Sequence, residues 1–382
     1  MRKILKTLFY AWWKICTLFP VNKNKVVIQS FNGRDFCDNP KYIALQLLKK
    51  NPRLVIYWAL NDMEKSSLPQ GIRPLKFKSL FYAFHMATAK VWIDNIRKPY
   101  IFKRKNQIYI QTWHGGFGLK NIEKDAANSL EAVYLQTAEK DAELTDLMIS
   151  NSHTLTKLYR DSFWYEDGEI LECGLPRNDK LFGFTEQEVY DVREKLSIPR
   201  YVKIALYAPT FRKSKSLDVY DLDYKMLAKK LGERFGGEWI ILLRLHPNVF
   251  VLSNNIEFDN KIIYNASLYS DIQELYMISD VVITDYSSVM FDFMILNRPC
   301  LLYASDVEEY RKDRDFFVSI DSLPFPMAQN NEELAEIILN FDETIYNQKV
   351  KKFYDFHGFC DRGHASEEVA DWIIERISKI KA

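Results

Sequence analysis

Short apolar runs alternate with helical stretches along the first half of the chain. The runs are rich in Val, Ile and aromatic residues, are bounded by turn residues, and mostly lack the polar alternation of a half-exposed strand. Such runs are typical of strands buried on both faces of a parallel sheet. The predicted strands are 25–31, 54–60, 91–95, 108–113, 146–152 and 169–174. Helical periodicity between them, as in 40–51 and 79–90, indicates βαβ units.

The same alternation starts again after a polar stretch near residues 184–200, which we interpret as a linker. The second set of predicted elements comprises strands 203–209, 239–245, 280–285 and 299–304, helices 223–235 and 287–297, and an amphipathic helix at 366–380. We therefore expect an α/β protein of two Rossmann-like domains facing each other across a cleft that holds the active site. The expected divisions are 1–20 for an N-terminal helix, 21–190 for the first domain, and 191–382 for the second domain with the C-terminal helix.

The first twenty residues have an amphipathic pattern of their own. A helix here would place one set of side chains on a broad apolar face: Ile4, Leu5, Leu8, Trp12, Ile15 and Phe19. Lys6 and Lys14 interrupt the run, so it is too short and too charged to span a bilayer, and no small-residue cleavage site marks a signal peptide. Basic amphipathic helices with tryptophans lie in the membrane interface. We expect that role, with packing on the domain's own core as the alternative.

Charge and cysteine content narrow the function classes. Among 382 residues, 52 Lys and Arg nearly balance 51 Asp and Glu, for a net charge of +1, so nucleic-acid binding is not expected. The five cysteines are scattered without a CxxC pair, which argues against a disulfide framework or a zinc site. The dinucleotide fingerprint, the P-loop and the GxSxG elbow are missing from the sequence. We expect no metal and no cofactor.

Two histidines follow predicted strands. His114 comes after 108–113 and precedes Gly115 and Gly116, and His246 comes after 239–245. The C-terminal ends of parallel strands carry catalytic groups in such folds, and a histidine accepts a proton from a hydroxyl near neutral pH. One such histidine alone is as easily a core residue, but two at equivalent strand ends favour catalysis.

A second candidate site begins where a buried strand ends at Asp285. Ser287 and Ser288 then start a predicted helix that also carries Asp292. Hydroxyls and free N–H groups at a helix start suit a phosphate, although serine is also an ordinary helix cap. Arg212, after another strand, would neutralise a diphosphate unless it is a solvated surface residue. The basic stretch 97–106 is expected to face acidic lipid or a phosphorylated acceptor, or to be a solvated loop.

A set of motifs in one order resembles the CDP-glycerol glycerophosphotransferase family. They are QTWHGGFGLK (111–120), GLPRND (174–179), YAPTFR (207–212), LRLHP (243–247), ITDYSSVMFDF (283–293), RPCLLYASDVEEYRKDRDFF (298–317) and DRGHAS (361–366). The resemblance runs from about residue 25 to the C-terminus. One departure adjoins His114: the family pattern WHGTPLK is replaced by a longer loop containing Gly116, Phe117 and Gly118.

The resemblance implies a GT-B-like fold and peripheral association with the cytoplasmic face of the cell membrane. It implies transfer of glycerol phosphate from CDP-glycerol, or ribitol phosphate from CDP-ribitol, to a lipid-linked saccharide or growing chain, with release of CMP. The product would be teichoic acid or capsule, and a homo-oligomer is compatible with this assignment. The expected catalytic residues are His114 and His246, and the expected substrate-binding residues are Arg212, Asp285, Ser287, Ser288, Asp292, Gly115 and Lys120.

In the mechanism we expect, His114 removes the proton of an acceptor hydroxyl. That hydroxyl attacks the β-phosphorus in line, and His246 stabilises phosphate charge or protonates the leaving group. A GT-B glycosyltransferase that uses a nucleotide sugar is the nearest alternative. A membrane-surface scaffold with a degenerate site is a more distant one.

Overall fold

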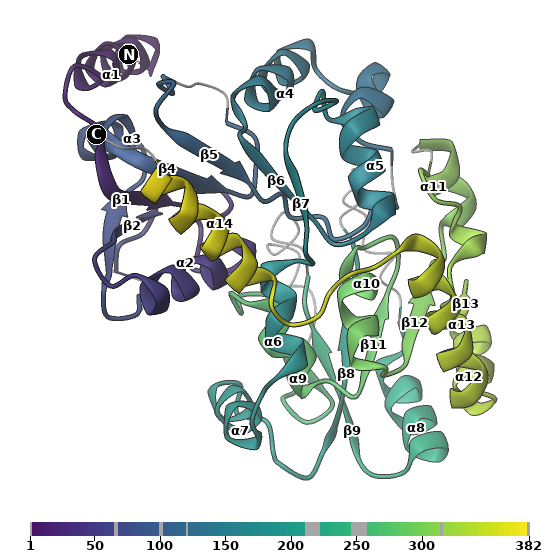
Figure 1. The fold of residues 1–382 in the computed structure, drawn as a ribbon. Coiled ribbons are helices and arrows are strands. Elements are labelled where there is room, and N and C mark those ends of the chain that lie inside the picture. Colours follow the sequence, from purple (N-terminus) through teal and green to yellow (C-terminus); the bar gives the residue numbers. More distant parts are fainter. Residues whose placement is uncertain are drawn as a thin grey trace. The chain divides into compact units, whose positions relative to one another are not determined.

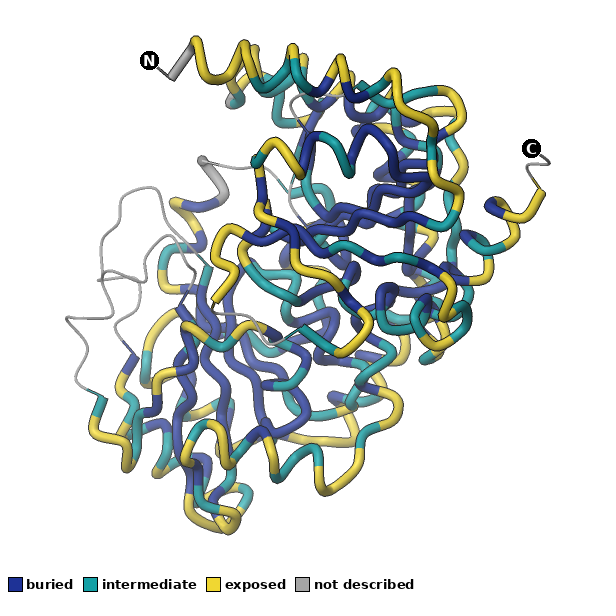
Figure 2. Tube along the Cα trace, turned by 90° about the vertical axis from the view of Figure 1, so that its left-hand side faces the viewer, coloured by how far each residue is buried: buried dark blue, intermediate teal, exposed yellow. Residues whose placement is uncertain are grey.

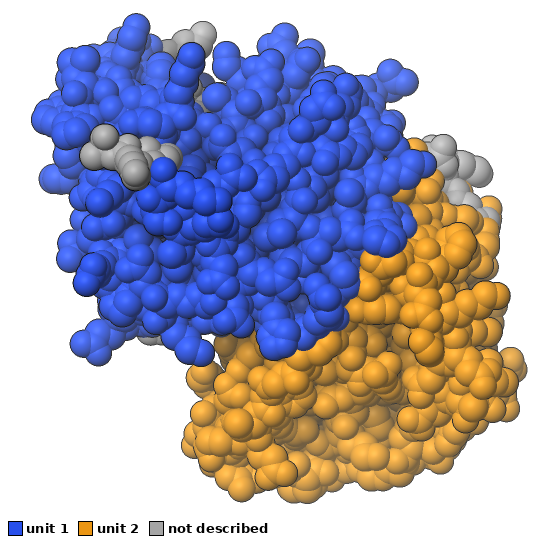
Figure 3. Space-filling view, viewed as in Figure 1, with its two compact units in different colours: residues 1–115, 122–179, 360–382 blue, residues 116–121, 180–359 orange. Residues whose placement is uncertain are grey.

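A computed structural model describes residues 2–64, 68–98, 102–119, 121–210, 222–245, 258–313 and 316–379. The chain divides into two compact units, which Figure 3 shows in different colours. Unit 1 contains residues 1–115, 122–179 and 360–382, and unit 2 contains residues 116–121 and 180–359. The chain therefore passes between the units four times.

Unit 1 is built on a parallel sheet of seven strands within the described residues, in the order β3-β2-β1-β4-β5-β6-β7. The strands are β1 (Asn22–Ile28), β2 (Val55–Leu60), β3 (Ile72–Lys76), β4 (Ala89–Asp94), β5 (Ile108–Gln111), β6 (Leu147–Ser150) and β7 (Ile170–Glu172). The helices are α1 (Arg2–Cys16), α2 (Asp38–Lys50), α3 (Leu80–Thr88), η1 (Glu123–Ser129), α4 (Ala132–Leu144), α5 (His153–Ser162), η2 (Pro176–Asn178) and α14 (Ala365–Lys379) (Figure 1).

Unit 2 has a second parallel sheet, of six strands where the structure describes the chain, in the order β10-β9-β8-β11-β12-β13. The strands are β8 (Lys203–Tyr207), β9 (Trp239–Leu243), β10 (Ile263–Asn265), β11 (Val281–Thr284), β12 (Cys300–Tyr303) and β13 (Met327–Ala328). The helices are α6 (Asp179–Phe182), α7 (Glu186–Lys195), α8 (Tyr224–Phe235), α9 (Ile272–Ile278), α10 (Val289–Phe293), η5 (Met294–Leu296), α11 (Val307–Asp313), η6 (Ile320–Ser322), α12 (Asn331–Leu339) and α13 (Glu343–His357). Two α/β units on parallel sheets confirm the expected fold class.

Alternating side chains of the central strands fill the two faces of the first sheet. Val26 and Ile28 of β1 belong to the apolar cluster with α2 and α14, whereas Val27 belongs to the cluster with α1 and α3. Strands β4, β5 and β6 are buried along their whole length, and Figure 2 draws the buried segments of the chain in dark blue. Burial on both faces explains why these runs lack polar alternation.

The C-terminal helix α14 packs on unit 1, although the sequence analysis assigned it to the second domain. Val369, Ala370 and Ile373 lie in the same apolar cluster as Val26 and Ile28. The chain returns from unit 2 at residue 360, so nearness in sequence to the second sheet was a misleading guide.

The polar stretch interpreted as a linker is a helix. Thr185 and Glu188 form a capping box, in which the Thr185 side chain accepts from the Glu188 N–H and the Glu188 carboxylate accepts from the Thr185 N–H. This reciprocal bonding starts α7 despite its polar composition.

Helix α1 has two apolar faces. Trp13 and Cys16 in its second half are buried against α3 and the sheet, while Ile4, Leu5 and Leu8 in its first half form an exposed row. Among the described residues, no helix is both long enough and apolar enough to cross a membrane.

Candidate functional site

His114 lies in a sharp turn directly after β5. Trp113 before it adopts a positive φ of 52°, and the two rings lie 4.5 Å apart between centroids. A Cβ at Gly115 would lie 3.2 Å from Nε1 of Trp113, so this position favours glycine for reasons of packing. The turn thus holds the imidazole half-buried at the carboxyl edge of the first sheet.

One hydrogen bond fixes the tautomer of His114. Its Nδ1 lies 2.9 Å from the backbone carbonyl oxygen of Asn95, at the end of the neighbouring strand β4. Because a carbonyl only accepts, Nδ1 carries the proton and Nε2 is the proton-accepting nitrogen. Burial lowers the pKa of His114 below its ordinary value of 6.5, which favours the neutral form. These are the properties of a general base.

A ring of hydrogen bonds runs from the His114 imidazole back to its own backbone. The side-chain amide of Asn95 donates to Asp38 Oδ2 (2.5 Å). Arg177 Nη1 donates both to Asp38 Oδ1 (2.7 Å) and to the backbone carbonyl oxygen of His114 (2.7 Å). Asp38, Asn95 and Arg177 are all buried. None of these three residues was predicted from the sequence as a site residue.

Asn39 makes a second link beside this ring. Its amide donates to the Trp113 carbonyl oxygen (3.2 Å), and its side-chain oxygen accepts from the Arg177 N–H (3.2 Å). The start of α2 therefore joins the turn at His114 to the short helix η2.

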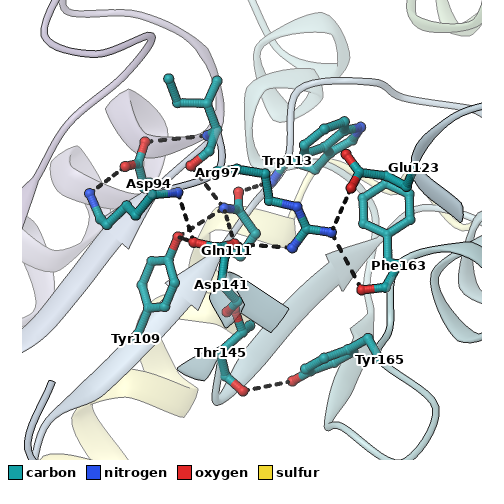
Figure 4. Close-up of polar contacts among 12 residues, drawn as sticks. Asp94, Arg97, Tyr109, Gln111, Trp113, Glu123, Asp141, Thr145, Phe163 and Tyr165 are labelled. Atoms are coloured by element: carbon teal, nitrogen blue, oxygen red, sulfur yellow. Dashed lines mark hydrogen bonds and ion pairs between the residues drawn. The ribbon is translucent and has the colours of Figure 1, made fainter. Parts of the chain in front are cut away.

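A buried charged network lies under the same turn (Figure 4). Gln111 accepts from the Trp113 N–H (3.0 Å) and donates to the Tyr109 hydroxyl (2.9 Å), which in turn donates to Asp141 (2.9 Å). Arg97 pairs with Asp141 at 3.0 Å. The stretch 97–106 was expected to face lipid or a phosphorylated acceptor, or to be a solvated loop. At its start, where Arg97 is buried in this network, it is neither lipid-facing nor solvated.

The loop that follows His114 changes unit within two residues. Residues 116–121 belong to unit 2, where Phe117 is buried among aromatic side chains. Its ring centroid lies 4.4 Å from that of Phe291 in α10 and 5.2 Å from that of Phe359. The loop that departs from the family pattern is thus anchored by an aromatic side chain.

The end of β11 in unit 2 forms the second candidate site. Asp285 is buried, and its carboxylate accepts from the N–H of Thr210 (2.9 Å) and the N–H of Tyr286 (2.7 Å). The bond from Thr210 joins the loop after β8 to the end of β11, so Asp285 fixes these two loops to each other.

Ser287 and Ser288 are half-buried at the start of α10. The Ser287 hydroxyl accepts weakly from the Val289 N–H (3.4 Å), whereas the Ser288 side chain makes no capping bond to the helix. Asp292 is buried within α10 and accepts from Gln273 (3.3 Å). The two serines present polar groups, and Asp292 supports the helix.

Three predicted site residues, Arg212, His246 and Lys120, lie outside the described residues. His114 and Gly115 belong to unit 1, and the Asp285–Asp292 segment belongs to unit 2.

The model of the CDP-glycerol:poly(glycerophosphate) glycerophosphotransferase family matches residues 12–375. The chain belongs to this family. It is 34% identical over 384 residues to a teichoic acid poly(glycerol phosphate) polymerase of Staphylococcus epidermidis, covering 94% of this chain and 52% of the relative. The chain therefore spans about half the length of that polymerase.

Other members of the family match this chain over nearly their full length. A poly(glycerol phosphate) polymerase of Bacillus spizizenii is 32% identical over 394 residues, which cover 98% of both chains. The solved structure of the wall teichoic acid polymerase TagF superposes with a TM-score of 0.86 at 31% identity, covering 99% of this chain and 96% of that one. The family expected from the motifs is confirmed.

Proposed function

We propose that this chain transfers glycerol phosphate from CDP-glycerol to a hydroxyl of a lipid-linked saccharide or a growing polyol-phosphate chain, with release of CMP. The observation that carries the proposal is the half-buried, Nδ1-protonated His114 at a strand end in a glycerophosphotransferase. Membership in the family supplies the donor class, and the geometry of His114 supplies the base.

The reaction needs one proton acceptor and charge stabilisation. Nε2 of His114 takes the proton of the acceptor hydroxyl as its oxygen bonds to the glycerol-bearing phosphorus of the donor. The bond from that phosphorus to the bridging oxygen breaks, and CMP leaves with the electron pair. Protonated His114 then returns its proton to solvent. Phosphoryl transfer of this kind depends on positioning and electrostatics rather than on covalent intermediates.

Unit 2 supplies the donor site in this proposal. Ser287 and Ser288 offer hydroxyls to the diphosphate, Arg212 balances its charge, and His246 stabilises the leaving phosphate. Asp285 and Asp292 act indirectly, by holding the loops and the helix that carry the serines.

The acceptor side of the proposal includes a membrane surface at the cytoplasmic face. The exposed row on α1 supports it, together with Leu80 and Phe81 of α3, which are also exposed. Trp12 of α1 donates to the Leu80 carbonyl oxygen (3.0 Å), which ties α1 to the start of α3. A surface of this kind beside basic residues suits the lipid interface.

A donor panel tests the proposed activity. Purified chain is titrated calorimetrically with CDP-glycerol, CDP-ribitol, UDP-GlcNAc and CMP, and CMP release is then followed with a lipid-linked acceptor. We expect CDP-glycerol to bind and to be consumed. Preference for CDP-ribitol would make the enzyme a ribitol-phosphate transferase, and preference for UDP-GlcNAc would overturn the proposal in favour of a glycosyltransferase.

Flotation with anionic vesicles tests the membrane surface. The double variant Leu5→Glu/Leu8→Glu should leave the vesicle fraction, whereas Ile345→Glu, at an exposed position of α13, should float as the wild type does. Equal flotation of all three proteins would exclude α1 as the membrane contact.

A further inference from the structure

The ring around His114 draws its members from four separate segments. His114 follows β5, Asn95 follows β4, Asp38 is the first residue of α2, and Arg177 lies in η2. These segments converge on one imidazole, and each link in the ring is 2.9 Å or shorter. A ring that closes on itself restrains both the side chain and the backbone of the residue it contains.

The ring is costly for the fold. Asp38 has a positive φ of 61°, a region that non-glycine residues seldom occupy. Asp38 and Arg177 also form a buried ion pair, with side chains only 7% and 5% exposed. A buried pair is weak evidence for stability, because apolar residues of similar volume often serve as well. The strained backbone of Asp38 and its buried ion pair with Arg177 therefore indicate that these residues have a role beyond stabilising the fold.

Burial also limits what the ring members can do. Asn95 is fully buried, and Asp38 and Arg177 are nearly so, so their direct contact with a large acceptor is disfavoured. Their route to the chemistry is through His114. The Asn95 carbonyl selects the proton on Nδ1, and the side chain of the same residue is held by two bonds, one to Asp38 and one from the Phe31 N–H (2.8 Å).

We propose that Asp38 and Arg177 are positioning residues that hold His114 in its Nδ1-protonated tautomer and keep Nε2 ready to accept the acceptor's proton. Asp38 fixes Asn95, whose carbonyl fixes the imidazole, and Arg177 fixes the carboxylate of Asp38 and the backbone of His114. The identity of the acceptor rests on the proposed function, whereas the tautomer of His114 does not.

Two variants separate positioning from stability. Arg177→Met removes every donor of the guanidinium and leaves Asp38 as an unpaired buried charge, so it should lower both the Tm and kcat. Adding Asp38→Asn removes that charge while keeping a residue that tolerates a positive φ, so the Tm should recover. Positioning predicts that kcat of the double variant stays about 10- to 100-fold low with the KM for CDP-glycerol unchanged.

The matched control is Lys103→Met, which breaks the Lys103–Asp146 pair (2.9 Å) of the same unit away from the ring. It should lower the Tm slightly and leave kcat unchanged.

The direct readout is nitrogen NMR of the full chain labelled with ¹⁵N-histidine, in which His114→Ala assigns the ring signals. In the wild type, Nδ1 should be protonated and Nε2 unprotonated. In the double variant, the signals should move toward a mixture with the Nε2-protonated form. A double variant that keeps the wild-type tautomer, or that regains kcat together with its Tm, overturns the positioning role.

This spectrum needs neither donor nor acceptor. If the wild type consumes no CDP-glycerol but the tautomer shifts as expected, the proposed function fails and the positioning role stands.

Discussion

The ends of β5 and β11 show two ways of preparing a strand end for chemistry. At β5, the backbone of Trp113 and of His114 is hydrogen-bonded to neighbouring side chains. The His114 imidazole donates its Nδ1 proton to the Asn95 carbonyl oxygen. At β11, the serines are half-buried and the Ser288 side chain caps nothing. A base must be held in one tautomer and direction before the reaction, whereas a phosphate site keeps polar groups available for its ligand.

Both regions use a strand-end aspartate in the same local way. Asp94 at the end of β4 accepts from the N–H of Asn95 (2.8 Å), and Asp285 after β11 accepts from the N–H of Tyr286 (2.7 Å). The difference lies in what surrounds them. Asp94 is also bonded to the side chains of Gln29 and Lys98 inside a charged network, whereas Asp285 accepts from the backbone and hydroxyl of Thr210 in the neighbouring loop.

The largest effect is expected from His114→Ala. Loss of the base should lower turnover about 10²- to 10⁴-fold, while donor binding, which we assign to the β11 end, should persist. The exposed His153, which pairs with Glu172, provides the control His153→Ala, expected to keep wild-type turnover. Undiminished turnover of His114→Ala in a CMP-release assay would show that His114 is not the general base.

Phe117→Ala tests whether the loop that follows the β5 turn is anchored in unit 2. Removing a ring packed on Phe291 and Phe359 should cost about 3–5 kcal/mol in the free energy of unfolding. Phe356 in α13 is 82% exposed, and Phe356→Ala should change stability by less than about 0.5 kcal/mol. Denaturant unfolding measures both, and equal stabilities would show that Phe117 does not anchor the loop.

Local patterns predicted the central strands because these strands are buried on both faces and therefore consist of unbroken apolar runs. β3 was missed because it is an edge strand with Arg73 and Pro74 in its centre. β10 and β13 were missed because three and two residues leave no pattern to detect. The capping box at Thr185 and Glu188 was a sequence signal for α7 that its polar composition obscured.

From the sequence, only those site residues that directly follow a predicted strand could be proposed. His114 and the segment from Asp285 follow apolar runs, and for that reason the sequence singled them out as candidates. Asp38 begins a helix and Arg177 lies in a short helix, so neither carries the strand-end signal. Only the folded chain brings them to His114. Signals did exist, since Asn95 ends a predicted strand and Arg177 lies in the GLPRND motif.

A smaller effect is expected from Ser288→Ala at the β11 end. Loss of one hydrogen bond to a charged phosphate should raise the KM for CDP-glycerol about 10- to 100-fold, corresponding to about 1.5–3 kcal/mol, with little change in kcat. Ser319→Ala, at an exposed turn of the same unit, is the control. If Ser288→Ala lowered kcat at an unchanged KM, the division of labour between the two strand ends would be wrong.

The smallest effect is a displacement of the pH profile. Burial lowers the pKa of His114, and the nearby Arg177 adds to the lowering. The imidazole must be neutral to act as base, so activity should fall only as the pH drops through this lowered pKa, below the ordinary 6.5 of histidine. Arg177→Met removes a positive charge and should move the acid limb of kcat toward higher pH. Ser288→Ala should leave that limb in place, because its hydroxyl belongs to the donor site. An acid limb at or above pH 6.5 in the wild type would mean that the β5 turn does not keep its histidine neutral by burial, and the contrast between the two strand ends would lose its electrostatic basis.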